Sequence, residues 1–161
     1  MTDAHLHLIL NHFPIISTIF GLLLLLIGLL LQNITLRRTA LAMFIFGALT
    51  AIPTYITGEG AEEIVEHLPN ISHDIIHEHE EEAEVFIWII SALGVLAAVT
   101  LFADLKKKGM SKILSWITLL LAIGTAIMSV DVGTSGGEIS HPEVRNEQGS
   151  AGEEFHSAEE H

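Results

Sequence analysis

The sequence predicts an all-α integral membrane protein, an up-down bundle of four spanning helices followed by an acidic tail. Hydrophobic residues make up 50% of the 161 residues and are clustered, and FGLLLLLIGLLL at residues 20–31 has no polar side chain. Uncharged apolar runs of about 18 residues or more are long enough to cross a bilayer. Short connections between such runs make consecutive helices antiparallel, which predicts the up-down topology.

Four spans follow in order along a single membrane domain, residues 1–143. Their approximate ranges are 8–31, 39–56, 85–102 and 113–130. Small residues such as Gly21, Gly47 and Gly94 punctuate them, and small residues let helices approach closely in lipid.

Two further segments differ in composition from the spans. Residues 61–67 have apolar side chains on one side and predict a short outer amphipathic helix, interrupted by Pro69 and Asn70. Residues 144–161 are acidic and poor in apolar groups, so we expect a disordered tail, because such a composition cannot offset chain entropy.

The basic residues predict the orientation. Arg37, Arg38, Lys112 and the lysines at 106–108 account for six of the seven Lys and Arg residues, and all six lie near two short connections. Excess Lys and Arg in short loops marks the cytoplasmic side. We therefore expect a bacterial inner-membrane protein with both termini outside, and all ten histidines then lie on the outer side.

Composition also excludes several classes of function. The net charge of −13 argues against nucleic-acid binding. The absence of cysteine excludes disulfides and thiolate metal sites. No nucleotide-binding loop, nucleophile elbow or HExxH motif is present.

Helical periodicity separates the histidines before the third span. With about 100° per residue and Ile75 at zero, His79 falls at about 40°, in the apolar stripe that includes Phe86. His77 falls at about 200° on the opposite face, where we expect water. The periodicity therefore predicts that His79 points into the bundle.

The stretch LILNHFPII at residues 8–16 places Asn11, His12 and Pro14 inside an apolar run. Pro14 cannot donate a hydrogen bond to the Leu10 carbonyl, so it starts or kinks the first span. Groups freed in this way are tolerated in a membrane where protein or water meets them. We therefore expect His12 to turn into the outer mouth of the bundle and to meet His79.

A third histidine follows the last span, in DVGTSGGEISHPE at residues 131–143. Gly136 and Gly137 permit a sharp turn, and we expect this turn to bring Glu138 and His141 over the bundle mouth. The sequence thus predicts His12, His79 and His141 as cofactor ligands, with Glu138 as a further metal ligand.

Four motifs resemble an uncharacterised bacterial family of four-helix membrane proteins, a domain of unknown function with an HFPI signature. They are HFPI, TGEGAEEIVEHLP, HEEEAE and GGEISHPE, each at a span boundary within residues 5–143. The resemblance implies the same fold. The matching positions are His12, Pro14, Gly58, His79, Gly137 and His141.

Three functions remain open from the sequence. The first is binding of haem b or a transition metal in a redox role, since neutral imidazoles ligate iron, zinc and copper and helix bundles hold haem between histidines. The second is a metal-dependent membrane enzyme. The third is an accessory subunit without a cofactor. The expected partners are the lipid bilayer and a redox protein or membrane complex.

Overall fold

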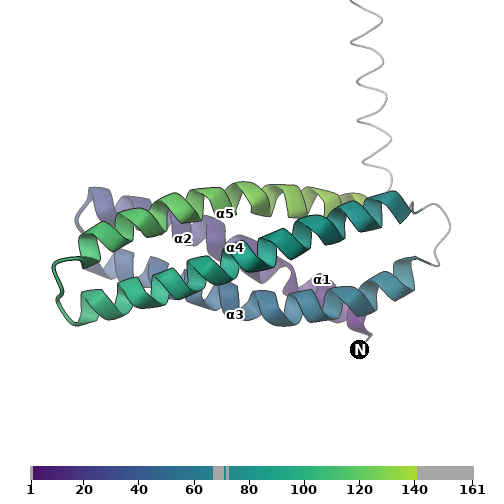
Figure 1. Cartoon of the computed structure of the whole chain (residues 1–161), viewed down its shortest axis with the longest axis horizontal. Helices are drawn as coiled ribbons and strands as arrows, with labels where there is room; N and C mark the ends of the chain where they lie inside the picture. The colour runs from purple at the N-terminus through teal and green to yellow at the C-terminus, as the bar shows by residue number, and fades with distance from the viewer. Residues whose placement is uncertain (1, 67–70, 72, 141–161) are drawn as a thin grey trace, which may run out of the picture.

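The structure is a computed structural model that describes residues 2–66, 71 and 73–140. All regular structure in these ranges is α-helical, which confirms the predicted fold class (Figure 1). The helices are α1 (Asp3–Leu10), α2 (His12–Leu30), α3 (Ile34–Val65), α4 (His73–Leu105) and α5 (Ser111–Ser140).

Four helical stretches are long and apolar enough to cross a membrane. They are Asp3–Leu30, Ile34–Val65, His73–Leu105 and Ser111–Ile139. Large apolar side chains cover their outer surface, and Trp88 and Leu120 are 73% and 68% exposed. A continuous apolar surface of this kind is expected to contact lipid.

The helices α2, α3, α4 and α5 form a closed ring in which each packs against its two neighbours. We call the end with His7 and His79 the histidine end; it lies at the right of Figure 1, with the N-terminus. We call the end with Lys106, Lys107, Lys108 and Lys112 the lysine end; it contains the α2–α3 and α4–α5 turns.

Small residues set the helix spacing inside the ring. A Cβ on Gly21 would lie 2.6 Å from the Phe44 ring, and Gly94 packs directly against Ala48 with no room for a side chain. Phe44 is 1% exposed and belongs to the main apolar core. These contacts are the close approaches that the small residues predict.

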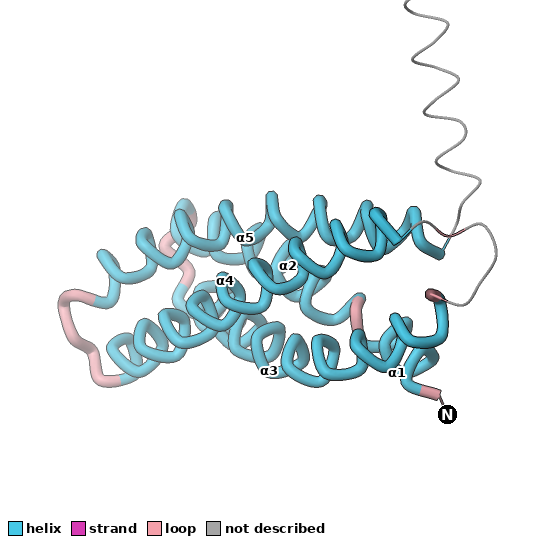
Figure 2. Tube along the Cα trace, turned by 45° about the vertical axis from the view of Figure 1, so that its right-hand side comes forward, coloured by secondary structure: helices cyan, strands magenta, loops and turns pink. Residues whose placement is uncertain are grey.

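The first span is divided at Asn11 into α1 and α2, and Figure 2 shows the short segment between them. Pro14 is buried in the first turn of α2, where its missing N–H group is tolerated. On the N-terminal side of this break, α1 packs mainly against α3. The polar residues in LILNHFPII therefore mark a change of helix direction.

Two connections differ from their sequence predictions. The separate helix expected over residues 61–67 is instead the last part of α3, which continues without a break to Val65, while residues 67–70 lie outside the described residues. The turn expected at Gly136 and Gly137 is also absent, because α5 remains helical through both glycines to Ser140. The predicted tail at 144–161 lies outside the described residues as well.

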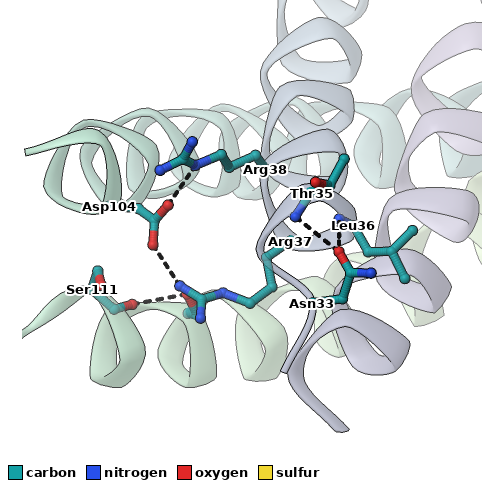
Figure 3. Close-up of polar contacts among 8 residues, drawn as sticks. Asn33, Thr35, Leu36, Arg37, Arg38, Asp104 and Ser111 are labelled. Carbon is teal, nitrogen blue, oxygen red and sulfur yellow. Dashed lines mark hydrogen bonds and ion pairs between the residues drawn. The ribbon is translucent and has the colours of Figure 1, made fainter. Parts of the chain in front are cut away.

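An ion-pair network joins α3 to α4 at the lysine end (Figure 3). Asp104 is 6% exposed and accepts from Arg37 Nη2 at 2.6 Å through Oδ1 and from Arg38 Nε at 2.7 Å through Oδ2. Asp104 is the one acidic residue that the sequence places at this end. Its two arginine partners explain why a carboxylate is tolerated there.

The start of α3 is fixed just before this network. Asn33 is its N-cap, and Asn33 Oδ1 accepts hydrogen bonds from the backbone N–H groups of Thr35 and Leu36 (Figure 3). Such a cap satisfies two amide groups that the first helical turn leaves without carbonyl partners. It therefore fixes the position from which Arg37 and Arg38 reach Asp104.

Candidate functional site at the histidine end

The helix α1 lies on two glycines of α3 at the histidine end. A Cβ on Gly60 would lie 2.6 Å from Asp3 Oδ2, and a Cβ on Gly58 would lie 3.4 Å from His7 Cε1. Asp3 and His7 are four residues apart and so share one face of α1. The two glycines of the TGEGAEE motif thus make room for the polar face of α1.

His7 is held by the backbone of α3. Its Nδ1 atom lies 2.9 Å from the Thr54 carbonyl oxygen, and the side chain is half-buried. A carbonyl only accepts hydrogen bonds, so Nδ1 carries the proton and donates it. In a neutral imidazole Nε2 then holds a lone pair.

His79 begins a hydrogen-bonded chain that crosses from α4 to α5 and returns to α4. The His79 Nδ1 atom lies 2.9 Å from Ser135 Oγ, and Ser135 Oγ donates to Glu82 Oε2 at 2.6 Å. The second acceptor within reach of the Ser135 hydroxyl is the Val132 carbonyl, at 3.3 Å. The arrangement is therefore carboxylate, hydroxyl and imidazole in series.

The protonation of His79 follows from this chain. A serine hydroxyl has a single proton, and both Glu82 and the Val132 carbonyl can only accept it. Whichever of them receives the proton, Ser135 Oγ must accept from His79 Nδ1–H. His79 therefore also has an unprotonated Nε2 when its imidazole is neutral.

Gly136 gives the His79 ring its space. A Cβ on Gly136 would lie 3.0 Å from His79 Cε1, whereas a Cβ on the neighbouring Gly137 would meet no described atom within 4 Å. The glycine pair of α5 thus serves a different purpose from the predicted turn. It lets α5 pass close to an imidazole that projects from α4.

The two histidines come from helices far apart in the sequence and lie within electrostatic range of each other. An open cleft of about 200 Å³ lies beside Ser135, between α4 and α5. Its wall carries the carboxyl groups of Glu78, Glu82, Asp131 and Glu138. These carboxyl groups place negative charge near His79, which favours a bound cation.

The site residues predicted from the sequence do not all lie in the same surroundings. His79 points inward, while the His77 side chain is 72% exposed, as the helical periodicity predicts for this pair. Glu138 lines the cleft beside Ser135. His141 lies outside the described residues.

His12 does not join His79 in the contacts of the described part of the chain. Its side chain is exposed, and its Nδ1 lies 3.1 Å from the Leu8 carbonyl oxygen in the preceding helical turn. The helix α1 packs against α3, and His7 contacts α3 through the Thr54 carbonyl. Among the described residues, His7 acts electrostatically on His79, and the ligand role of His12 stays a sequence prediction.

Sequence reasoning missed His7 because the predicted first span began at residue 8 and left His7 outside it. A usable signal was present in the spacing of Asp3 and His7, which matches one helical turn and faces the glycines of TGEGAEE. Residues 2–66, 71 and 73–140 contain no group of three His, Asp or Glu side chains arranged to hold a metal ion. Within these residues, His7 and His79 are each held through Nδ1 by a partner on another helix.

A comparison with known protein families identifies the family of this chain. The model of a family described as predicted membrane protein, DUF2231, matches residues 4–144. The chain belongs to the DUF2231 family. This match confirms the resemblance drawn from the four motifs and covers the helices that build both ends of the bundle.

No curated protein and no solved structure matches the chain. The DUF2231 description states a membrane location and leaves the molecular function open. In this DUF2231 protein, the residues of the histidine end are the basis for proposing a function.

Proposed function

We propose that this protein binds a transition metal at its histidine end through the Nε2 atoms of His7 and His79. One observation carries the proposal: each Nδ1–H group is donated to a protein acceptor, which leaves each Nε2 atom with a lone pair. Metal-binding histidines are typically held by a hydrogen bond from their other ring nitrogen to a carbonyl or a polar side chain. Imidazole suits iron, copper and zinc.

The surrounding residues support a cation. The Glu82 carboxylate acts on His79 through Ser135, which increases the basicity of the imidazole as a ligand. Glu78, Asp131 and Glu138 add negative charge around the adjoining cleft. Glu138 and His141, the remaining ligands that the sequence predicts, would complete a site with three or four donors.

Haem is the second candidate, because the described histidine end offers two imidazoles on different helices. A bis-histidine haem in a helix bundle needs only this donor set. Either group would suit an electron-transfer or redox-partner role. With the lysines in the cytoplasm, the site would face the outer side of the inner membrane.

The decisive experiment is metal and haem analysis of the purified protein with two matched pairs of variants. We expect the wild-type protein to retain about one metal or haem per chain. His7→Ala and His79→Ala should lose it, while His12→Ala and His77→Ala should keep it. A Soret absorption band would identify haem, and metal without that band would identify an ion.

Other outcomes would contradict the proposal in distinct ways. Loss of metal in His12→Ala together with retention in His7→Ala would restore the sequence-predicted ligand set and reject the one proposed. Absence of both metal and haem from the wild-type protein, also after incubation with Zn²⁺, Cu²⁺ or haemin, would favour a structural accessory subunit. A His141→Ala variant tests the third ligand: weaker binding would support its role.

A further inference from the structure

The lysine end has a basic surface that the metal proposal does not use. Lys106, Lys107, Lys108 and Lys112 are exposed around the α4–α5 turn. Lys107 has a φ of 53°, in the left-handed region, which ends α4 sharply and clusters the neighbouring lysines. The turn therefore concentrates four positive charges within seven residues.

These lysines have no acidic partner among the described residues, in contrast to the two arginines nearby. The one carboxylate described at this end, Asp104, has both oxygens occupied by Arg37 and Arg38. The arginine charge is thus partly neutralised inside the bundle. The lysine charge stays on the surface, available to a partner outside the chain.

An exposed aromatic ring orders two of the lysines at the apolar boundary. The Nζ atoms of Lys106 and Lys108 each lie 5.8 Å from the centroid of the Phe102 ring, within the range of cation–π attraction. Phe102 is 56% exposed on the outer surface of α4. Two ammonium groups are therefore held where the apolar surface of the helix ends.

Apolar side chains continue this surface on both sides of the turn. Leu105, Met110 and Ile113 are 56%, 55% and 65% exposed. A partner that fits this arrangement has an anionic head beside the lysines and hydrocarbon along the neighbouring helices. That combination is the chemistry of an anionic phospholipid.

We propose that the lysine surface, formed by Lys106, Lys107, Lys108 and Lys112 around Phe102, preferentially binds anionic phospholipid. The phosphate interacts with the ammonium groups, and the acyl chains lie against Phe102 and Ile113. Charge complementarity distinguishes this surface from the rest of a chain whose net charge is −13. The proposal is independent of metal binding at the other end.

The two tryptophans of the chain provide a test with an internal control. Trp116 lies four residues after Lys112 on α5, hence on the same helix face, and is 43% exposed. Trp88 is 73% exposed on α4, toward the histidine end. The variants Trp88→Phe and Trp116→Phe each leave a single reporter in the full chain.

The experiment compares quenching of each reporter by brominated phosphatidylglycerol and by brominated phosphatidylcholine in reconstituted vesicles. At low ionic strength we expect phosphatidylglycerol to be preferred about fivefold around Trp116, and no such preference around Trp88. In about 1 M salt the preference should largely disappear, because the Debye length falls to about 3 Å.

A combined variant with glutamine at all four lysines, made in the Trp88→Phe background, should lose the preference and keep its thermal stability. Equal lipid ratios at Trp116 and Trp88 in the chains with native lysines would overturn the proposal. Retention of the preference in the glutamine variant would overturn it as well. Neither result would affect the metal proposal, which concerns the opposite end.

Discussion

The two ends of the bundle both use hydrogen-bonded side chains to join helices, but they leave different atoms available. At the lysine end, both oxygens of Asp104 are occupied by arginines of the same chain. At the histidine end, the Nδ1 atoms of His7 and His79 are occupied in the same way, but each ring has a second nitrogen. The same kind of restraint therefore produces a structural link at one end and a pair of oriented donors at the other.

This difference separates a role in stability from a role in binding. A buried carboxylate between two arginines contributes chiefly by avoiding unpaired charges, so its loss is costly. A histidine held through Nδ1 presents a nitrogen ligand in a fixed direction, and its removal should affect ligand binding more than folding. Variants at each end can test this division.

The largest effect on stability is expected for Asp104→Asn. Arg37 and Arg38 would lose their carboxylate partner, and Arg37 is only 14% exposed. We expect a loss of about 3 kcal/mol in unfolding free energy. This value is near the lower end of the range for breaking a buried ion pair, because Arg38 is 37% exposed. Denaturant unfolding in detergent measures it.

The control for this variant is Glu81→Gln, which removes a carboxylate whose side chain is 73% exposed at the opposite end. It should change the unfolding free energy by less than about 1 kcal/mol. Equal stabilities of the Asp104 and Glu81 variants would show that the arginine network is not a structural link.

The next largest effect is expected on metal affinity, when the space beside His79 is filled. The variants Gly136→Val and Gly137→Val test it. Both substitutions place the same side chain in the same helix, so their helix-propensity costs are matched. At Gly136 the new Cβ would lie 3.0 Å from the His79 ring and must displace it, whereas Gly137 has no described neighbour within 4 Å. We expect metal affinity to fall about 10- to 100-fold for the first variant alone, measured by metal titration.

Ser135→Ala should have a smaller effect on the same site. His79 keeps its position beside Gly136 but loses the acceptor for its Nδ1 proton, so we expect about a tenfold loss of metal affinity. Thr134→Ala is the control, since the exposed Thr134 hydroxyl donates to the Val130 carbonyl in its own helix. Equal metal affinities in the two variants would show that Ser135 does not orient His79 for metal binding.

The smallest effect is expected for the buried hydroxyls of Thr100 and Thr118, which join α4 to α5 at 3.0 Å, with Thr100 four residues before Asp104. Each hydroxyl is also within reach of a carbonyl in its own helix. A double-mutant cycle with Thr100→Val and Thr118→Val should give a coupling of about 0.6 kcal/mol in unfolding free energy. A coupling above about 2 kcal/mol would show that this hydroxyl pair, rather than the arginine network, provides the main polar link.

The fold could be predicted from sequence because the length of an apolar segment can be read directly from consecutive residues. Each span is visible as an uninterrupted run, and short connections determine the antiparallel order. The ends of the helices were less predictable, because packing overrides local signals there. Gly58 and Gly60 stay helical since α1 lies on them, and Gly136 stays helical since the His79 ring lies against it.

The candidate site was predictable only where one helix sufficed. His79 follows from the periodicity of α4, as does the exposed position of His77. The position of His7 depends on the packing of α1 against α3, on the N-terminal side of Asn11. The partnership of Ser135 with His79 joins residues 56 positions apart and leaves no local pattern.

The central claim is that His7 and His79 both carry their proton on Nδ1 and leave Nε2 unprotonated. Long-range ¹H–¹⁵N NMR of the metal-free protein, labelled with ¹⁵N-histidine, measures the tautomer of each ring above the pH at which the rings become neutral. His7→Ala and His79→Ala variants assign the two signals. The account predicts the Nδ1–H tautomer for both, although free histidine prefers Nε2–H. An Nε2–H tautomer at either residue would contradict the account, because that nitrogen would then have no lone pair to offer a metal.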